Sequence, residues 1–170
     1  MKKYLKYSGI CAALFAIVAF ILVMVGVGIQ LKGDGVTVDV ETAAGLIFGS
    51  KHEGILDNGT YKPAATSLIG WILLLVGLVI VILGIVLPLL KVNALEKFAG
   101  VLNLVAVGCF VTAGVLFFFG KGAWYAANDM DVPDSAVLTG NVIVGGILSI
   151  VAGAFAILPA AFDFVGNKKK

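Results

Sequence analysis

The sequence has no arginine and only two cysteines, and charged side chains are missing from long stretches. Cys11 and Cys109 lie far apart inside apolar runs, so the outer loops have no disulfide framework and no Cys-x-x-Cys motif is present. The missing arginine indicates an A/T-rich genome and a bacterial host. Hydrophobic residues make up 61% of the chain, against about 45 to 50% in soluble domains, which excludes an ordinary soluble core.

Four uncharged runs are the main feature of what is present, at 7–31, 63–90, 98–120 and 135–162. About 20 apolar residues in an α-helix cross the roughly 30 Å hydrocarbon core of a bilayer. We therefore expect an all-α integral membrane protein with one domain over 1–170, folded as an antiparallel bundle of four transmembrane helices. The expected spans are 8–30, 66–90, 98–119 and 137–162, and the outer loops are 31–65 and 120–136.

The lysines predict how these spans are oriented. Eight of the twelve fall in the N-terminal arm, the short middle loop and the tail: Lys2, Lys3, Lys6, Lys91, Lys97, Lys168, Lys169 and Lys170. Most of the acidic residues fall in the other two loops. Because cytoplasmic loops are enriched in lysine, we expect both termini in the cytoplasm of a multi-pass cell membrane protein. The first apolar run is too long for a signal peptide and is interpreted as a retained anchor.

The larger first outer loop carries its own structural pattern. Val36, Val38 and Val40 alternate with polar residues, which is typical of a short strand or hairpin. An apolar segment at 43–50 is compatible with a helical turn at the membrane interface. Asp57-Asn58-Gly59 is a turn signal. In the second outer loop, Trp124 and Tyr125 stand where interfacial aromatic residues are expected.

Small residues recur along the spans at intervals that keep them on one helix face. Such stripes allow close backbone approach, which is the main device of helix association in lipid. We expect packing within one bundle, with a contact between protomers as the alternative. The residues of this helix-packing set are Gly70, Gly77, Gly84, Ala99, Ala106, Ala113, Gly145, Ser149 and Gly153.

The spans contain no ionisable residue at mid-depth, which disfavours proton-coupled transport. Asn103 is the most polar deep residue, and we expect a hydrogen bond to a neighbouring helix, with a pore contact as the alternative. No nucleophile elbow, phosphate-binding loop or HExxH motif occurs. The sequence therefore predicts no catalytic residue and no cofactor, and the protein is not expected to be an enzyme.

Two groups of residues with acidic side chains are candidate metal sites. His52 is the only histidine and stands near Glu53 and Asp57, without a second His or Cys. Asp129, Asp131 and Asp134, with Asn128, offer oxygen atoms for Ca²⁺, but the spacing lacks the glycine and the terminal glutamate of an EF-hand. A solvated acidic loop is the better interpretation, and no metal site is predicted.

Four spans, cytoplasmic ends, a larger patterned first loop and a small second loop together resemble the layout of claudin-type tetraspan proteins. Gly45-Leu46-Ile47-Phe48 is loosely similar to the Gly-Leu-Trp segment of that family, and the family's paired loop cysteines are missing here. The resemblance therefore implies a shape and not a function.

We expect a non-enzymatic structural, assembly or interaction component. Its partners would be membrane lipid and either a second copy of itself or another membrane protein, and no nucleic acid. An oligomeric pore or channel, or an accessory subunit of a membrane transport complex, is the alternative. The expected interaction surface comprises Val36, Val38, Val40, Leu46, Phe48, Trp124, Tyr125, Asp129 and Asp131.

Overall fold

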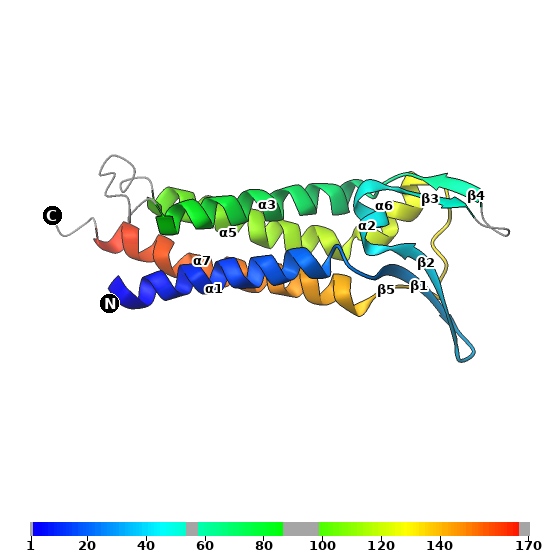
Figure 1. The fold of residues 1–170 in the computed structure, drawn as a ribbon, viewed down its shortest axis with the longest axis horizontal. Helices are drawn as coiled ribbons and strands as arrows, with labels where there is room; N and C mark the ends of the chain where they lie inside the picture. The colour runs from blue at the N-terminus through cyan, green and yellow to red at the C-terminus, as the bar shows by residue number, and fades with distance from the viewer. Residues whose placement is uncertain (1, 54–57, 87–98, 167–170) are drawn as a thin grey trace.

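The computed structural model describes residues 2–53, 58–86 and 99–166 and shows a mostly helical chain with a small sheet (Figure 1). Four long helices lie side by side: α1 Lys2–Leu22, α3 Ala65–Val86, α5 Ala99–Phe118 and α7 Gly140–Gly166. Among the described residues, three segments are long and apolar enough to span a membrane, at Ala65–Val86, Gly100–Phe118 and Gly140–Ala161, and a shorter apolar helix covers Tyr7–Leu22. The middle loop with Lys91 and Lys97, the tail lysines Lys168–Lys170, and Asp57 lie outside the described residues.

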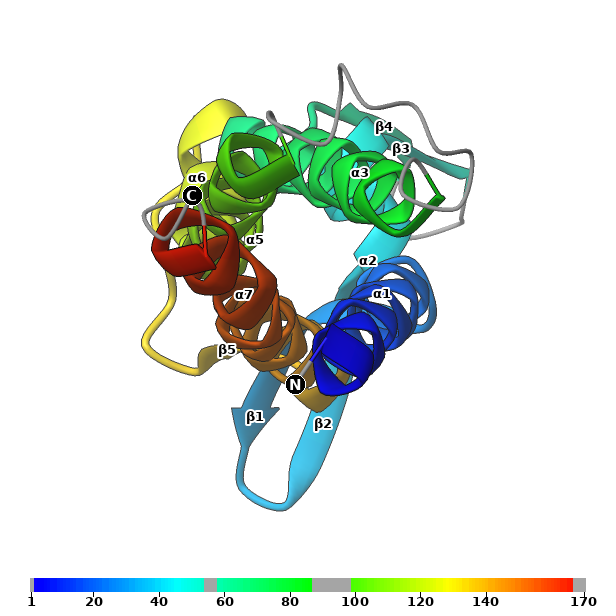
Figure 2. The same ribbon diagram turned by 90° about the vertical axis from the view of Figure 1, so that its left-hand side faces the viewer.

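Seen along the bundle, the helices form a ring in the order α1, α7, α5, α3 (Figure 2). Each of the first three packs extensively against the next, and contacts between α1 and α3 are sparser. The seam between α1 and α3 is therefore the most loosely joined side of the ring.

A cap of short elements covers one end of the bundle (Figure 1). We define the cap as β1 Val27–Gly33, β2 Val36–Thr42, α2 Ala43–Phe48, β3 Ser50–Glu53, β4 Asn58–Tyr61, α6 Gly120–Ala127 and β5 Ala136–Leu138. Three strands form an antiparallel sheet in the order β2-β1-β5, and β3 pairs antiparallel with β4. Segments from both expected outer loops thus fold together into one unit.

Three boundaries differ from those expected from the sequence. The first helix ends at Leu22 and not near residue 30, because Val27–Gly33 pairs as a strand. The side-chain amide of Asn141 donates hydrogen bonds to the carbonyl oxygens of Leu22 (3.4 Å) and Val25 (2.5 Å), which satisfies backbone acceptors left free by the end of α1. The last helix begins at Gly140 because 136–138 forms β5, and 120–127 is helical although a loop was expected there.

The glycine stripe on α3 faces α5 of the same chain. A Cβ atom built on Gly70 would lie 3.2 Å from the Ala113 carbonyl oxygen, and one on Gly77 would lie 2.8 Å from the Phe110 ring. Ala106 and Ala113 are fully buried, and Ala99 is the first residue of α5. These small residues allow α3 and α5 to approach closely.

The helix α7 uses small residues on two sides. On the side of α1, a Cβ atom built on Gly145 would lie 2.5 Å from Cγ1 of Val23. On the side of α5, a Cβ atom built on Gly153 would lie 3.0 Å from Cγ2 of Val111. The buried Ser149 hydroxyl donates a hydrogen bond to the carbonyl oxygen of Phe110 at 2.8 Å. In this way α7 joins α1 to α5.

The helices α5 and α7 approach closely at Gly114 and Gly146, which the sequence pattern did not single out. A Cβ on Gly114 would lie 2.6 Å from the Gly146 carbonyl oxygen, and one on Gly146 would lie 3.1 Å from the Gly114 carbonyl oxygen. Neither belongs to the seven-residue or four-residue stripes that we read from the sequence, so their reciprocal contact emerges only when α5 and α7 are placed together.

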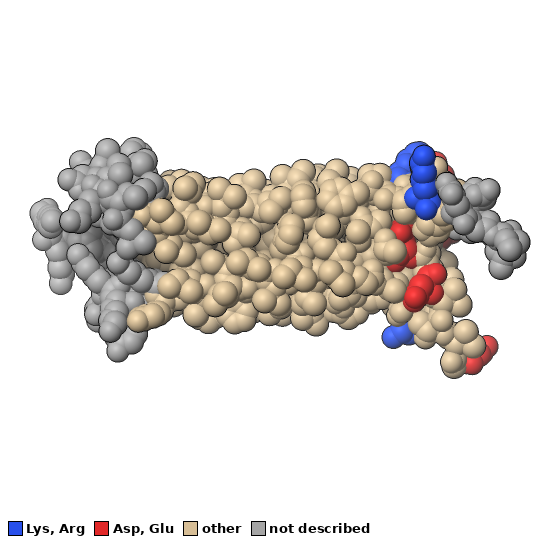
Figure 3. Space-filling model, viewed as in Figure 1, with Lys and Arg blue, Asp and Glu red and all other residues tan. Residues whose placement is uncertain are grey.

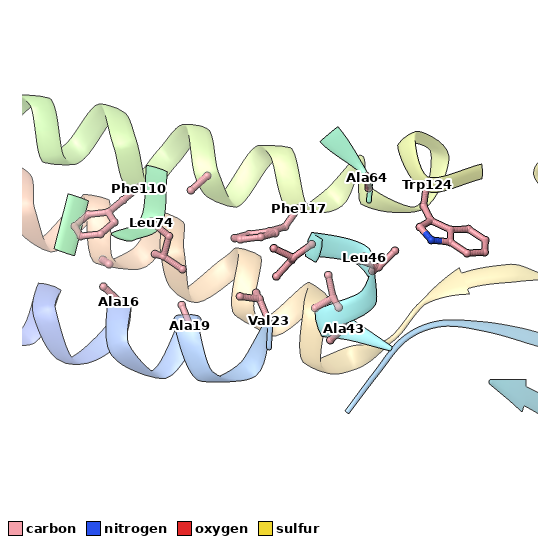
Figure 4. Close-up of a cluster of buried hydrophobic side chains, with 14 of the residues drawn as sticks. Ala16, Ala19, Val23, Ala43, Leu46, Ala64, Leu74, Phe110, Phe117 and Trp124 are labelled. Carbon is pink, nitrogen blue, oxygen red and sulfur yellow. The ribbon is translucent and has the colours of Figure 1, made fainter. Parts of the chain in front are cut away.

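A continuous apolar core runs from the bundle into the cap (Figure 4). It starts among alanines of α1, such as Ala16, passes Leu74 and Phe117, and reaches Leu46 of α2 and Trp124 of α6. Since the same core fills both parts, the cap is held on the bundle by packing as well as by the chain connections.

We predict that Gly114→Ala destabilises the protein, because the added methyl group overlaps the Gly146 carbonyl and Ile150 of α7. Overpacking of this kind costs about 1 to 3 kcal/mol of unfolding free energy. The matched control is Gly108→Ala on the same helix, where a Cβ would meet nothing within 4 Å. Thermal unfolding followed by helical circular dichroism should show a lower midpoint for the first variant only. Equal midpoints would contradict the contact.

Candidate functional site

The cap contains the residues expected to form an interaction surface, and the structure separates them into two groups. Val36, Val38 and Phe48 are exposed, as are Asp129 and Asp131, and Val40 is half-buried. The other members are Leu46, Trp124 and Tyr125, which are buried in the cap core, at 1%, 2% and 4% exposure respectively. The surface that a partner can reach is therefore built mainly from the β1–β2 hairpin and the acidic segment after α6.

Glu41 lies in the expected first outer loop, and its side chain is completely buried between β2, α2 and β3. One carboxylate oxygen accepts a hydrogen bond from the Thr42 backbone amide at 2.7 Å. The other accepts one from the Ser50 hydroxyl at 2.5 Å. A buried carboxylate is costly unless it is paired in this manner, so these bonds make Glu41 a structural centre of the cap.

Two irregularities in the β1–β2 ladder bring Glu41 to this position. Asp39 pairs with Gln30 and Glu41 pairs with Ile29, which leaves Val40 as an extra residue on β2. The next step leaves Gly28 as an extra residue on β1. Such bulges redirect side chains relative to the regular alternation of a strand. Asp39 is consequently exposed while Glu41 is buried, although a period of two would put them on one face.

The helix α2 starts directly after Glu41 and shares its hydrogen-bond network. The Thr42 hydroxyl oxygen accepts a hydrogen bond from the Gly45 amide at 2.9 Å, which is the usual arrangement of a threonine N-cap. A Cβ on Gly45 would lie 2.0 Å from a carboxylate oxygen of Glu41, so only glycine fits there. Gly49 ends the helix with a φ of 78°, which is open to glycine at little cost.

His52 lies beside the Glu41 carboxylate, with 3.7 Å between its Nε2 atom and Oε1 of Glu41. Its ring is also the first of an aromatic series. Ring centroids are 5.1 Å apart for His52 and Tyr61, 5.4 Å for Tyr61 and Trp124, and 5.0 Å for Trp124 and Tyr125. This series connects the β3–β4 hairpin to α6, so the only histidine of the chain has a packing role in the cap.

Neither acidic group forms a recognisable metal centre in the described part of the chain, where no three His, Cys, Asp or Glu side chains gather. The side chain of Glu53 and the whole of Asp57 are not among the parts of the chain that the structure describes.

Asn128 joins the segment after α6 to the segment after β4. Its Oδ1 accepts a hydrogen bond from the Lys62 amide at 2.7 Å, and its Nδ2 donates one to the Lys62 carbonyl oxygen at 3.2 Å. Lys62 also forms an exposed ion pair with Asp129 at 4.0 Å.

Asn103 lies near the start of α5, at the end of the bundle away from the cap. Its side chain is buried and faces α3, where a Cβ on Gly84 would lie 3.0 Å from Asn103 Oδ1. The structure thus brings Asn103 together with Gly84, another member of the helix-packing set, in a contact between two helices of one chain.

We predict that Glu41→Ala destabilises the cap, because it leaves the Thr42 amide and the Ser50 hydroxyl without their acceptor. Each buried polar group left unpaired costs about 1 to 3 kcal/mol. Asp131→Ala removes an exposed carboxylate and serves as control, with an expected change within about 0.5 kcal/mol. Chemical denaturation followed by tryptophan fluorescence, in a Trp71→Phe background so that the signal comes from Trp124, measures the stability of the cap. Similar stabilities of the two variants would contradict the structural role of Glu41.

Alkaline pH provides a second test of the cap, since burial raises the pKa of the Tyr125 hydroxyl above its ordinary value near 10. A group with a raised pKa in the folded state contributes stability below its unfolded pKa and loses that contribution as the pH rises through the folded value. We expect thermal stability to fall above about pH 10, and less steeply in Tyr125→Phe. An identical decline in both proteins would rule out a contribution from Tyr125.

Comparison with known proteins does not add a function to this geometry. No protein-family model matches the chain, and no curated protein matches it significantly.

Proposed function

We propose that the chain is a four-span protein of the bacterial cell membrane, with both termini in the cytoplasm and the cap outside. Besides the three long apolar helices, α1 has 21 residues and lies along the other three. Its apolar part, Tyr7–Leu22, measures about 24 Å at 1.5 Å per residue, and the uncharged run continues to Leu31, so this segment can cross a hydrocarbon core of about 30 Å. The N-terminal lysines are at the end away from the cap, where the positive-inside rule puts the cytoplasm.

The side of the bundle supports this arrangement. Each long helix exposes large apolar side chains, for example Leu14, Val79, Leu104 and Ile147. On the face shown in Figure 3, the described part of the bundle carries no charged side chain, and lysines and acidic residues gather at the cap. Exposed apolar surface of this extent fits lipid and not water.

Within that membrane we propose a non-enzymatic role, in which the cap mediates contact with a second copy or with another membrane protein. The observation that carries the proposal is the construction of the cap. A buried carboxylate network and an aromatic series join the elements of the cap, and a shared core holds the cap on the bundle, while the exposed valines of β2 remain open to a partner. Such a rigid base with an apolar exposed edge suits recognition.

Asn103 faces Gly84 of its own chain, so its described contact does not favour an oligomeric pore. A role as an accessory subunit of a transport complex is one form of the proposed contact with another membrane protein.

We predict that the protein assembles through its cap. Amine-reactive cross-linking in native membranes, followed by mass spectrometry, should join Lys32, Lys51 or Lys62 of the cap to a second copy or to another membrane protein. A reagent that does not cross the membrane should reach these lysines in intact cells and leave Lys2 and Lys3 unmodified. A strictly monomeric protein without any cross-linked partner would refute the function, and the reverse labelling pattern would refute the orientation.

A further inference from the structure

The strand β2 lies at an edge of the three-stranded sheet and has no strand on its other side within the described part of the chain. With β1 it forms a hairpin that projects outside the ring of helices (Figures 1 and 2). Val36 and Val38 on this strand are 63% and 53% exposed. An exposed apolar edge strand presents unpaired backbone amides and carbonyls, and another strand can pair with them.

The hairpin geometry identifies which backbone groups are free. Asp34 and Gly35 form a two-residue turn, with φ values of 43° and 79°, and Gly33 pairs with Val36 beside it. In such a hairpin the closing residues exchange hydrogen bonds, and hydrogen-bonded pairs then alternate along the ladder. Val36 and Val38 therefore direct their amide groups toward β1, while Thr37 and Asp39 direct theirs to the open edge.

We propose that β2 of a second copy pairs antiparallel with this edge, with Val38 opposite Val38 of the second copy. The inference rests on the proposed function and names its partner and its contact. Two three-stranded sheets then become one six-stranded sheet with twofold symmetry, in which each residue of one β2 meets its counterpart in reversed order.

Charge selects this register over its neighbours. With Val38 at the centre, Thr37 of each copy lies opposite Asp39 of the other, and both form hydrogen-bonded backbone pairs. Lys32, which pairs with Thr37 on β1, occupies the same row and places a positive charge near that Asp39. A register centred on Asp39 would put two carboxylates directly opposite each other, which destabilises a sheet. A register centred on Thr37 would place the turn residues of each hairpin opposite the other β2 strand, so fewer residues of the two strands would pair.

The apolar side chains support the same register. Val38 of the two copies forms a non-hydrogen-bonded pair, with Cα atoms about 4.5 Å apart and the side chains close together. Leu31 pairs with Val38 on β1, so a row of Leu31, Val38, Val38 and Leu31 crosses the joined sheet. This row would cover valine surface that the single chain exposes.

The experiment is disulfide formation in the full chain, reconstituted in lipid vesicles, on a background of Cys11→Ala and Cys109→Ala. Val38→Cys should form a covalent dimer under mild oxidation, because a Cα separation of about 4.5 Å permits a disulfide. Val36→Cys and Thr37→Cys are the matched controls. Their Cα atoms would be about 14 Å and about 9 Å from their own counterparts, beyond the limit of about 7 Å. Non-reducing electrophoresis should show the dimer several-fold more strongly for Val38→Cys.

A second variant tests the backbone contact itself. Thr37→Pro removes an amide that points to the open edge and leaves the hydrogen bonds between β1 and β2 in place. Added to Val38→Cys, it should abolish most of the dimer without changing the thermal midpoint of the protein.

Preferential dimer formation by Val36→Cys or Thr37→Cys would overturn the register. Absence of dimer at all three positions, with cap lysines still cross-linking to a partner, would overturn pairing through β2 and leave the proposed function standing. Absence of both kinds of cross-link would overturn both.

Discussion

The need of every backbone amide and carbonyl for a hydrogen-bond partner determines where this chain changes from helix to strand. In an apolar setting only helices satisfy their backbone internally, so the chain stays helical along the bundle. At the cap end, α1 stops at Leu22, and the amide of Asn141 takes over two of the carbonyls that become free. The sheet begins only a few residues later. Asn141 thus ties the end of one helix to the start of α7 at the level where sheet pairing replaces helical bonds.

This transition explains why the sequence predicted the four helices better than their ends. The first uncharged run extends to Leu31, and absence of charge indicates an apolar environment without distinguishing a helix from a buried strand. Within β1, the central strand of the sheet, Gly28 and Ile29 are buried, and no charge precedes Lys32. Asp34-Gly35, a strong hairpin signal between two runs rich in β-branched residues, would have located both strands.

The residues of the cap were harder to assign, because burial there depends on contacts between segments distant in the sequence. The alternation at Val36, Val38 and Val40 was visible, and the structure places a strand there. The burial of Glu41 was not visible, since it depends on the bulge at Val40 and on the packing of β2 against α2 and β3. Trp124 looked like an interfacial residue, and it packs against Tyr61 of the other loop. The contact of Gly114 with Gly146 likewise depends on how two helices meet.

The same bulge gives the hairpin two ends with different properties. At its base, Glu41 and Thr42 are fixed by hydrogen bonds to α2 and β3; toward its tip, Val36 and Val38 contact little of their own chain. Anchoring the base reduces the conformational freedom that a free hairpin would lose on binding, so more of the interaction energy is retained as affinity. Burying a carboxylate is costly by itself. The buried Glu41 carboxylate contributes here by holding an edge strand in a defined direction outside the ring of helices. The polar centre of the cap and its apolar edge are therefore parts of one arrangement.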